Sequence, residues 1–427
     1  MRTKILILLL FPLFAFAQTT LTMSELFDSL KTHPTAMGDD LRMEQARIGR
    51  KMAYSKLYPN IDAIGRYDYS STPSAMLPVP PNTLIAMVKQ TTDAQPFSER
   101  IYRAGAIVSM PIFIASIYTM AAKADAMYQS AQDQKYINLL KNEAIVVSAN
   151  ANLHFMQAME EALEKKKTSL QKTKEFVVIK VDNGRAPGSA LILVNNAINQ
   201  VDIAQNDIVL QRDEVVSAIR SLTGVTVLQP VPMEQIGTYK NGDMKSLDPL
   251  RKKLEADRLD RRAEIQKLFP TLVVQGSYSN NFANAYNNNM SIRNDFYTVG
   301  VVLKIPLFAA DQYTQIQKST VDADFSENEL SRMTGELAAQ SAQLQKSVGV
   351  LENSIALYTK SINEKAELLN IAKVSYQSDQ LSMEDYLKYE DDLILEKTKL
   401  FKAQAQKWQA IVKLAVIFGN PIEEIVQ

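Results

Sequence analysis

The sequence predicts a mainly α-helical chain that also carries transmembrane β-strands, organised as two tandem copies of one unit. Three observations predict this class. Short segments around proline and glycine recur in the same order in both halves, four segments alternate strictly between apolar and polar residues, and two very long stretches contain almost no helix-breaking residue. Composition agrees, because glycine is only 14 of 427 residues, which is too few for a chain built on tight phosphate-binding loops.

Charge and composition exclude several classes of function. Lys+Arg and Asp+Glu both number 47, so there is no basic excess that would indicate a nucleic-acid partner. Cysteine is absent and histidine occurs twice, so disulfides, thiolate chemistry and a histidine-built metal site are not expected, and no cofactor is predicted. Residues 1–17 combine a basic start, a short apolar core and an Ala-Phe-Ala end, which predicts a signal peptide cleaved before Gln18.

Repeated landmarks divide the rest of the chain into residues 18–224 and 225–427. Each predicted copy contains a helix, a strand pair and a helical hairpin, and the second opens on a mixed segment at residues 225–249. A Pro-rich stretch around residues 72–81 accounts for an insertion in the first copy. The matched segments are Lys56–Pro59 with Lys267–Pro270, Met110–Phe113 with Ile305–Phe308, and Leu222–Gly224 with Ile417–Gly419. The predicted helix–strand transitions are therefore Pro59, Pro111, Pro270 and Pro306, because proline cannot continue a helix or a paired strand.

Each copy begins with a predicted helix, at residues 36–57 and 250–268, that leads into a pair of strands of about ten residues. On every strand one face is apolar and the other polar. The polar faces carry Asp62, Arg66, Asp68, Arg103, Ser109, Gln275, Ser277, Thr298 and Lys304. The apolar faces carry the aromatic residues Tyr67, Tyr102, Tyr278 and Tyr297, as the girdles of membrane barrels do. The connections at residues 71–100 and 280–295 are polar and are predicted to be long loops.

The alternating pattern of these strands is compatible with two structures. A sheet of this kind could be half-buried on a soluble core, or it could belong to a membrane barrel, since about ten residues is the length of a tilted membrane strand. Four strands cannot close a barrel, and open sheet edges are not tolerated in lipid. The membrane reading therefore requires association, and a trimer would supply twelve strands.

Long helices follow each strand pair. Residues 112–180 contain neither Pro nor Gly, and residues 307–373 contain only Gly335 and Gly349. A heptad in the second stretch predicts helix–helix packing along its length, with Leu330, Leu337, Leu344, Leu351 and Tyr358 at one position and Val348, Ile355, Ile362 and Leu369 at the other. Each helix then reverses at a short tip and returns to Gly224 or Gly419. The predicted tip residues are Asp182, Asn183, Gly184, Arg185, Ser378, Asp379, Gln380, Leu381 and Ser382.

With these landmarks in order, the chain resembles the TolC family of outer-membrane efflux proteins along essentially all of its mature length. The second tip adds a spacing pattern formed by Tyr376, Asp379, Ser382, Asp385 and Leu387. The resemblance implies a trimeric channel-tunnel, in which a twelve-stranded barrel in the outer membrane continues as an α-helical coiled-coil barrel through the periplasm. It also implies a passive exit duct of an efflux or type I secretion system, whose tips dock on a periplasmic adaptor and an inner-membrane pump.

The resemblance places a constricted entrance just past the second tip. Asp385 stands at one of the acidic positions of the family, whereas Lys388 stands where the family has a second acid. A ring of three Asp385 carboxylates would favour cations. The alternative is that Asp385, Glu384 and Glu390 are ordinary helix N-terminal acids, which the helix dipole favours. Asp379 also departs from the family, which has glycine there, and the absence of cysteine removes any lipid-anchored form.

Two competing functions remain. A periplasmic adaptor would carry one coiled-coil hairpin between Gly- and Val-rich β-domains, whereas this sequence has two hairpins and little glycine. An enzyme such as a cell-wall hydrolase would need a catalytic motif, and no P-loop, His-Glu-x-x-His, Gly-x-Ser-x-Gly or Gly-x-Gly-x-x-Gly pattern occurs. The sequence therefore favours a non-enzymatic channel.

Overall fold

The computed structural model describes residues 21–89 and 92–427, so the predicted signal peptide at residues 1–17 lies outside the described part. The described residues form two compact units. The sheet unit consists of residues 40–136 and 247–336, and the hairpin unit consists of residues 21–39, 137–246 and 337–427. Two long helices, α4 (Ala115–Asp182) and α7 (Ala310–Gln377), contribute residues to both units.

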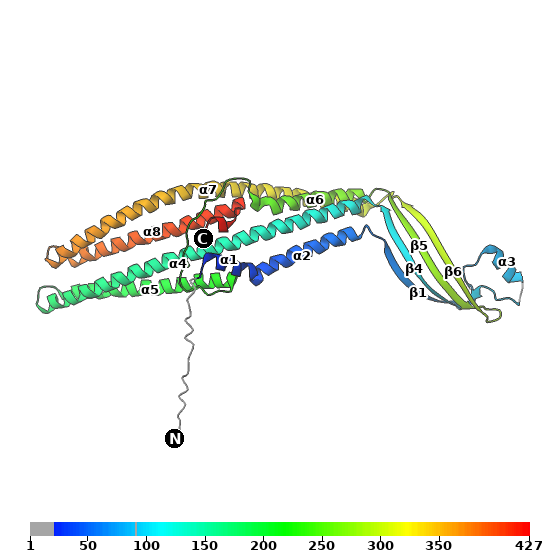
Figure 1. The fold of residues 1–427 in the computed structure, drawn as a ribbon, viewed down its shortest axis with the longest axis horizontal. Coiled ribbons are helices and arrows are strands. Elements are labelled where there is room, and N and C mark those ends of the chain that lie inside the picture. Colours follow the sequence, from blue (N-terminus) through cyan, green and yellow to red (C-terminus); the bar gives the residue numbers. More distant parts are fainter. Residues whose placement is uncertain (1–20, 90–91) are drawn as a thin grey trace, which may run out of the picture. The chain divides into compact units, whose positions relative to one another are not determined.

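The sheet unit contains one four-stranded antiparallel sheet in the order β1-β4-β5-β6 (Figure 1). Its strands are β1 (Asn60–Tyr69), β4 (Arg100–Phe113), β5 (Thr271–Asn284) and β6 (Ser291–Lys304). The two predicted strand pairs are therefore confirmed, and β4 joins them by pairing with β5. Strands β1 and β6 are the edges, since the described part of the chain supplies no second neighbour to either.

The predicted long loop at residues 280–295 is wrong. Strands β5 and β6 continue to Asn284 and from Ser291, so residues 285–290 alone form the turn. Asparagine is uncommon in strands, but here its side chains pair across the ladder. The Nδ2 of Asn281 donates to the backbone carbonyl of Asn294 at 3.3 Å. The described residues of the second predicted loop, at 71–89 and 92–100, also contain regular elements, namely β2 (Ala75–Met76), α3 (Pro81–Lys89) and β3 (Phe97–Ser98).

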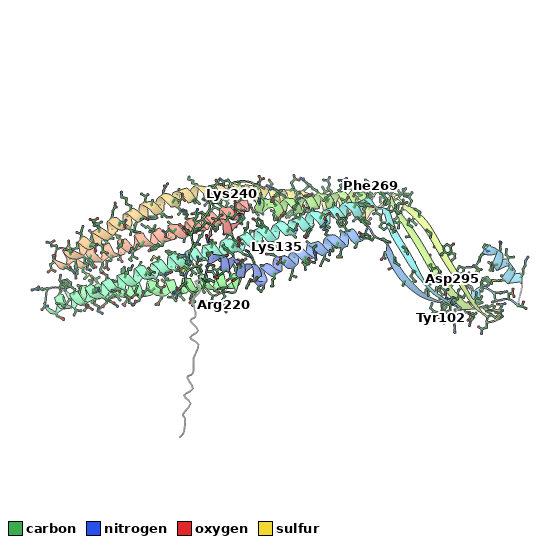
Figure 2. The ribbon with its side chains drawn as sticks, viewed as in Figure 1. Tyr102, Lys135, Arg220, Lys240, Phe269 and Asp295 are labelled. Carbon is green, nitrogen blue, oxygen red and sulfur yellow. The ribbon has the colours of Figure 1, made fainter. Side chains whose placement is uncertain are left out.

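The helices that enter the sheet end before the prolines that were predicted to end them. Helix α2 spans Pro34–Ser55 and α6 spans Asp248–Gln266, each a few residues short of Pro59 or Pro270. The residue before a proline avoids the helical region, so the helix stops earlier than the ring itself requires. Figure 2 shows Phe269, which precedes Pro270, at the junction of α6 with β5.

The other two transition prolines differ from each other. Pro306 lies between β6 and α7, as predicted. Pro111 lies inside β4 instead of at its exit, paired with Val273 and next to an irregularity in the register. Proline lacks an N–H and is tolerated only at strand edges or bulges. Position 111 meets that condition because the pairing of β4 with β1 ends at Ser109.

In the sheet unit, charged side chains connect the helices. Arg50 of α2 forms an ion pair with Asp125 of α4. Lys123 Nζ of α4 lies 2.8 Å from Asp260 Oδ1 of α6. These bridges are partly exposed, so each contributes at most about 1 kcal/mol to the free energy of unfolding. Their contribution to the stability of the unit is therefore small.

The hairpin unit contains two antiparallel helical hairpins, in which α4 reverses into α5 (Gly188–Thr223) and α7 reverses into α8 (Met383–Phe418) (Figure 1). The returning helices end at Gly224 and Gly419, whose φ angles of 73° and 68° are left-handed and close the helix as expected. Along α7 every predicted heptad residue is half-buried, which agrees with packing on that side of the helix.

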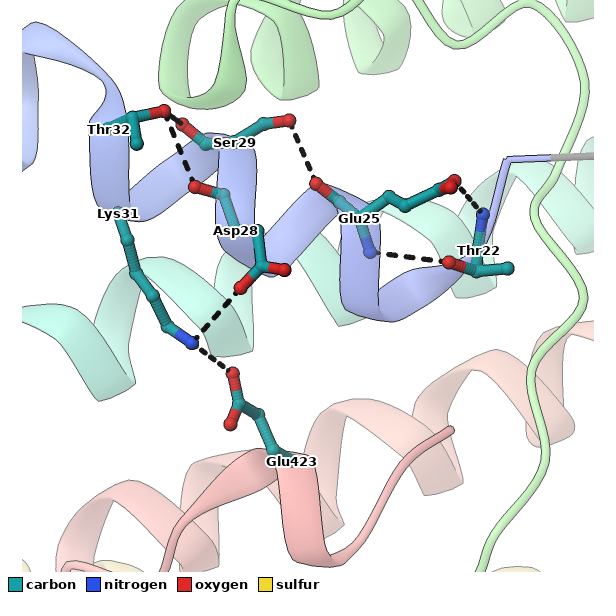
Figure 3. Close-up of polar contacts among 7 residues, drawn as sticks. All are labelled: Thr22, Glu25, Asp28, Ser29, Lys31, Thr32 and Glu423. Atoms are coloured by element: carbon teal, nitrogen blue, oxygen red, sulfur yellow. Dashed lines mark hydrogen bonds and ion pairs between the residues drawn. The ribbon is translucent and has the colours of Figure 1, made fainter. Parts of the chain in front are cut away.

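The core of the hairpin unit lies where α1 (Met23–Thr32) packs on the middle of α4 and the ends of α5 and α8. Four apolar side chains of α1, Met23, Leu26, Phe27 and Leu30, are almost fully buried. A capping box starts this helix: the Oγ1 of Thr22 accepts from the Glu25 amide at 3.3 Å, and Glu25 Oε2 accepts from the Thr22 amide at 2.9 Å (Figure 3).

A charged pair holds α1 to the C-terminal segment. Lys31 Nζ lies 2.6 Å from Glu423 Oε1. A dashed line marks this ion pair in Figure 3. In the same unit the carboxyl of Glu143 is 3% exposed. Burial, with a smaller contribution from the Glu423 carboxylate, raises the pKa of Glu143 to about 7, and the Lys31 ammonium opposes that rise. Glu143 therefore changes charge close to neutral pH.

Candidate functional site

The first hairpin tip is closed by backbone geometry that requires glycine. The Arg185 amide donates to the Lys180 carbonyl at 2.8 Å, and the Gly184 amide donates to the Val181 carbonyl at 2.9 Å. Gly184 has a φ of 67°, in the left-handed region where a side chain is unfavourable. The predicted tip residues Asp182, Asn183, Gly184 and Arg185 are all exposed here.

The second tip repeats this geometry with aspartate in place of glycine. The Gln380 amide donates to the Ser375 carbonyl at 2.9 Å, the same closing bond as in the first tip. Asp379 has a φ of 62°, which aspartate tolerates better than most residues because it can adopt the left-handed conformation. Ser378, Asp379, Gln380 and Ser382 are exposed, whereas Leu381 is half-buried against the neighbouring apolar cluster.

Asp379 has a partner that glycine could not provide. Its carboxylate pairs with the ammonium of Lys180, near the end of α4. The Lys180 side chain is only 12% exposed, and its Nζ lies 4.7 Å from the ring centre of Phe176 and 4.9 Å from that of Tyr376. The cation therefore sits between two aromatic rings and one carboxylate, a combination that stabilises a partly desolvated charge.

An apolar cluster joins the two tips beneath these charges. Its buried members are Val177, Ala190 and Val194 from the first hairpin and Ala372, Tyr376, Met383 and Tyr386 from the second. The rings of Tyr376 and Tyr386 stack with centres 5.4 Å apart. Because both hairpins supply side chains, opening the space between the tips would expose this cluster to water.

A buried polar network lies next to the cluster, and no motif in the sequence predicts it. The Tyr386 hydroxyl donates to Glu390 Oε1 at 2.7 Å, and the Ser169 hydroxyl donates to the same oxygen at 2.6 Å. Burial, together with the Glu390 carboxylate, raises the pKa of Tyr386 to about 12. Within the described residues the other oxygen of Glu390 has no hydrogen-bond partner. Glu390 is thus a buried member of the tip junction and not a helix N-terminal acid.

The two predicted entrance residues lie on the exposed side of α8. Asp385 and Lys388 are both exposed and are one helical turn apart. Ser382 caps α8, because its Oγ accepts from the Asp385 amide at 3.1 Å and donates to Asp385 Oδ2 at 2.6 Å. Asp385 is therefore an acidic residue of the first helical turn, and its carboxylate lies at the exposed surface of the tip.

The second feature of interest is the sheet, in which one face is mainly apolar and the other mixes charged residues with apolar ones such as Ile107 and Phe296. One face carries the polar and charged residues, including Asp68, which lies 2.6 Å from Arg66 Nε and 3.0 Å from Arg103 Nε. The other carries side chains such as Val299 and Tyr297, which are 78% and 77% exposed. A large apolar surface of this kind is costly in water and marks a contact with lipid or protein.

The predicted barrel aromatics lie on this apolar face. Tyr67 is opposite Tyr102 on the neighbouring strand, with ring centres 4.9 Å apart, and Tyr102 stacks on Phe282 at 5.0 Å. Tyr278 is opposite Tyr297 in the β5–β6 ladder. Figure 2 shows Tyr102 and Asp295 toward the end of the sheet away from Phe269. Aromatic residues thus line the apolar face near that end.

Neither region contains a cluster of metal-binding side chains among the described residues. Nowhere in residues 21–89 and 92–427 do three or more His, Cys, Asp or Glu side chains gather closely enough to hold a metal ion. Among the helices of the described chain, none is both long and apolar enough to cross a lipid bilayer.

Comparison with known proteins identifies the fold through structure and not through sequence. No family model matches the chain, and no curated protein matches it. The outer membrane protein VceC from Vibrio cholerae superposes with a TM-score of 0.79 at 14% identity, over 93% of this chain and 96% of that one. The CmeC outer membrane channel from Campylobacter jejuni gives 0.77 at 14% identity, over 93% and 85%. A membrane protein from Pseudomonas aeruginosa gives 0.79 at 13% identity, over 93% and 91%.

Proposed function

We propose that this chain, which has the fold of outer-membrane channels, is a TolC-family protein. It is the outer-membrane channel of an efflux or type I secretion system, located in the outer membrane and extending into the periplasm. It acts as a passive exit duct for solutes and not as an enzyme. One observation carries the proposal, namely a four-stranded sheet with an exposed apolar face and two unpaired edges.

The sheet supports a closed barrel formed by several copies. In lipid every backbone N–H and C=O needs a partner, so an open-edged sheet cannot span a membrane alone. Pairing β6 of one copy with β1 of the next satisfies both edges, and three copies give twelve strands around a water-filled interior. The apolar face then meets lipid, and the face with Arg66, Asp68 and Arg103 lines the pore.

The tips support docking of a periplasmic adaptor. Their outermost residues are exposed, while the residues below them join both hairpins of one chain into one surface. An adaptor that contacts both tips would therefore meet a single preformed surface. The inner-membrane pump that the family resemblance implies would then supply the energy for export.

The entrance is proposed at Asp385 and Lys388. On a threefold axis the exposed carboxylates of Asp385 would repel one another and attract cations, while Lys388 would offset that charge. Purified protein in planar lipid bilayers tests this. We expect Asp385→Ala to lower the preference for cations and Lys388→Gln to raise it. Unchanged single-channel currents and reversal potentials in both variants would remove these residues from the entrance.

The alternative, a periplasmic adaptor, is not favoured. The sheet exposes Val299, Tyr297 and Leu303 on one face, and such an exposed apolar face is not expected in an adaptor. Cell fractionation followed by electrophoresis with and without heating distinguishes the two. A channel is recovered in the outer membrane as an oligomer that heat dissociates, whereas recovery with the inner membrane would support the adaptor. A water-soluble monomer would contradict both the barrel and the channel.

A further inference from the structure

The segment between β1 and β4 is an addition to the first half of the chain, and the proposed channel function assigns it no role. Residues 75–89 and 92–98, called the cap below, contain the β2–β3 pair and helix α3. Ala75 and Met76 pair with Ser98 and Phe97. Figure 1 shows α3 beyond the end of the sheet at which β1 finishes and β4 begins.

The cap is fastened to the turn between β5 and β6. Asn287 holds it at two points: its Nδ2 donates to the Asp93 carbonyl at 2.7 Å, and its Oδ1 accepts from the Gln95 amide at 3.0 Å. The Asn288 Nδ2 donates to the Thr92 carbonyl at 3.0 Å. The asparagine-rich turn is therefore a clamp that holds the cap in one position.

The strand register shows on which side of the sheet the cap lies. Ile101, Ala283 and Ile292 are opposite one another along β4, β5 and β6. Because side chains alternate, these three share the face of Arg103, two residues from Ile101. That is the polar face.

The cap buries this end of the polar face. Leu77 of the cap and Ile101 are each 0% exposed, and Ala283 and Ile292 are 4% and 9% exposed. All four belong to one apolar cluster. Asn294, on the same face, donates a side-chain hydrogen bond to the Pro78 carbonyl. On the other face of the same strands, Tyr102 and Phe282 remain 42% exposed. The cap therefore covers the polar side alone.

We propose that the cap is an inward-folded constriction at the outer end of the channel, which limits the size of the solutes that leave it. This inference rests on the proposed function, because the polar face lines the pore only in a closed barrel. Each copy then contributes one cap, folded over the rim of its own sheet and clamped there by Asn287 and Asn288. The exit is narrowed by an ordered element with its own small core and not by a free loop.

A single introduced cysteine tests where the cap lies, because the chain has none of its own. Met76 is 39% exposed while its neighbour Leu77 is fully buried against the sheet, so alternation directs Met76 away from the polar face and into the pore. We expect a charged thiol reagent to change the current through Met76→Cys channels in planar bilayers. The matched control is Tyr297→Cys, which is 77% exposed on the apolar face and whose modification should leave the current unchanged.

Removal of the cap tests what it does. In a second variant a short Asn-Gly turn replaces residues 70–99 and joins β1 to β4 directly, because Tyr69 pairs with Arg100. We expect higher single-channel conductance and a shift of the polymer size cut-off, measured with polyethylene glycols of graded mass, toward larger polymers. The double variant Asn287→Ala/Asn288→Ala keeps the cap but loosens its clamp, and it should increase current noise if the cap narrows the pore.

The outcomes separate this inference from the proposed function. If the wild-type protein forms no channel, the proposed function fails. If it forms a channel whose conductance and size cut-off do not change when the cap is removed, the constriction is refuted and the channel stands. If the shortened variant does not fold, Met76→Cys decides: a current insensitive to the reagent, despite mass-spectrometric proof of modification, overturns the constriction.

Discussion

Two glycines at matched positions of the two strand pairs offer a direct test of the sheet. A Cβ added to Gly105 on β4 would lie 2.0 Å from the Tyr278 carbonyl oxygen and 2.8 Å from the Ser279 Cα, both backbone atoms of β5. A Cβ added to Gly300, the equivalent residue of β6, would meet nothing within 4 Å. Alanine at position 105 therefore forces two backbones apart, whereas alanine at position 300 enters open space.

The size of the effect follows from these distances. Carbon–oxygen contacts between strands are ordinarily about 3.3 Å or longer, so β4 and β5 must separate locally by more than about 1 Å. Overpacking of this kind costs about 1–3 kcal/mol, and the two weakened flanking hydrogen bonds add about 1 kcal/mol each. For Gly105→Ala we expect a loss of about 3–5 kcal/mol in unfolding free energy, or roughly 1–2 M in the urea midpoint. For Gly300→Ala we expect a change within about 1 kcal/mol.

The assay is urea unfolding of the purified protein in detergent or vesicles, followed by the shift between folded and unfolded bands in unheated electrophoresis. The decisive quantity is the difference in urea midpoint between the two variants, and not either midpoint alone. Equal shifts of the midpoint for Gly105→Ala and Gly300→Ala would refute the close approach of β4 and β5. A loss in Gly300→Ala that exceeds the loss in Gly105→Ala would refute the strand register as well.

Three further predictions concern the hairpin unit. Tyr386→Phe removes a hydroxyl that donates to the buried carboxylate of Glu390. It should lower the free energy of unfolding by about 1.5–3 kcal/mol and speed hydrogen exchange in α8. Equal exchange rates in the variant and the wild type would show that the hydroxyl contributes nothing. Asp379→Asn loses the ion pair with Lys180, but Asp379 is 65% exposed, so thermal melting should show a loss of unfolding free energy below about 1 kcal/mol. Asp379→Gly loses the same ion pair but is free of left-handed strain, so it should melt at a higher temperature than Asp379→Asn. Glu143 has a pKa of about 7 in the folded protein against an ordinary 4.5. Its contribution to the free energy of unfolding, about 3 kcal/mol in total, is therefore complete below pH 4.5 and is lost as the pH rises through about 7. Thermal melting from pH 5 to 8 should show this decline, and Glu143→Gln should remove it.

The strand faces and hairpin tips were predictable because each depends on residues close together in the sequence. Alternation over a single strand decides which side chains share a face, so Tyr67 and Arg66 were placed on opposite faces correctly. The tip at Gly184 follows from the need for a left-handed residue after a helix. The matching tip at Asp379 was found through the repeat, although aspartate is a weaker signal than glycine.

What the sequence could not show are contacts between residues far apart in the chain. Ser169 and Glu390 lie in different copies of the repeat, and nothing around Glu390 marks it as buried. The best available signal was the spacing of Tyr386 and Glu390, which puts both on one face of α8. Residues 280–295 were misjudged for a different reason. Their asparagines look like a loop in composition, but only residues 285–290 form the turn. The Nδ2 of Asn281 bonds to β6 and the Nδ2 of Asn287 bonds to the cap, and composition does not show such long-range partners.

The open edges of the sheet also bear on how the protein reaches its final state. On the proposed three-copy ring, no chain can satisfy the backbone groups of β1 and β6 until its neighbours arrive. Completion of the sheet and association are then a single event, whose rate depends on the local concentration of chains. A cell that makes too little of the protein would accumulate unsealed chains, and those chains, with bare strand edges, are the form most exposed to proteases and to wrong pairing.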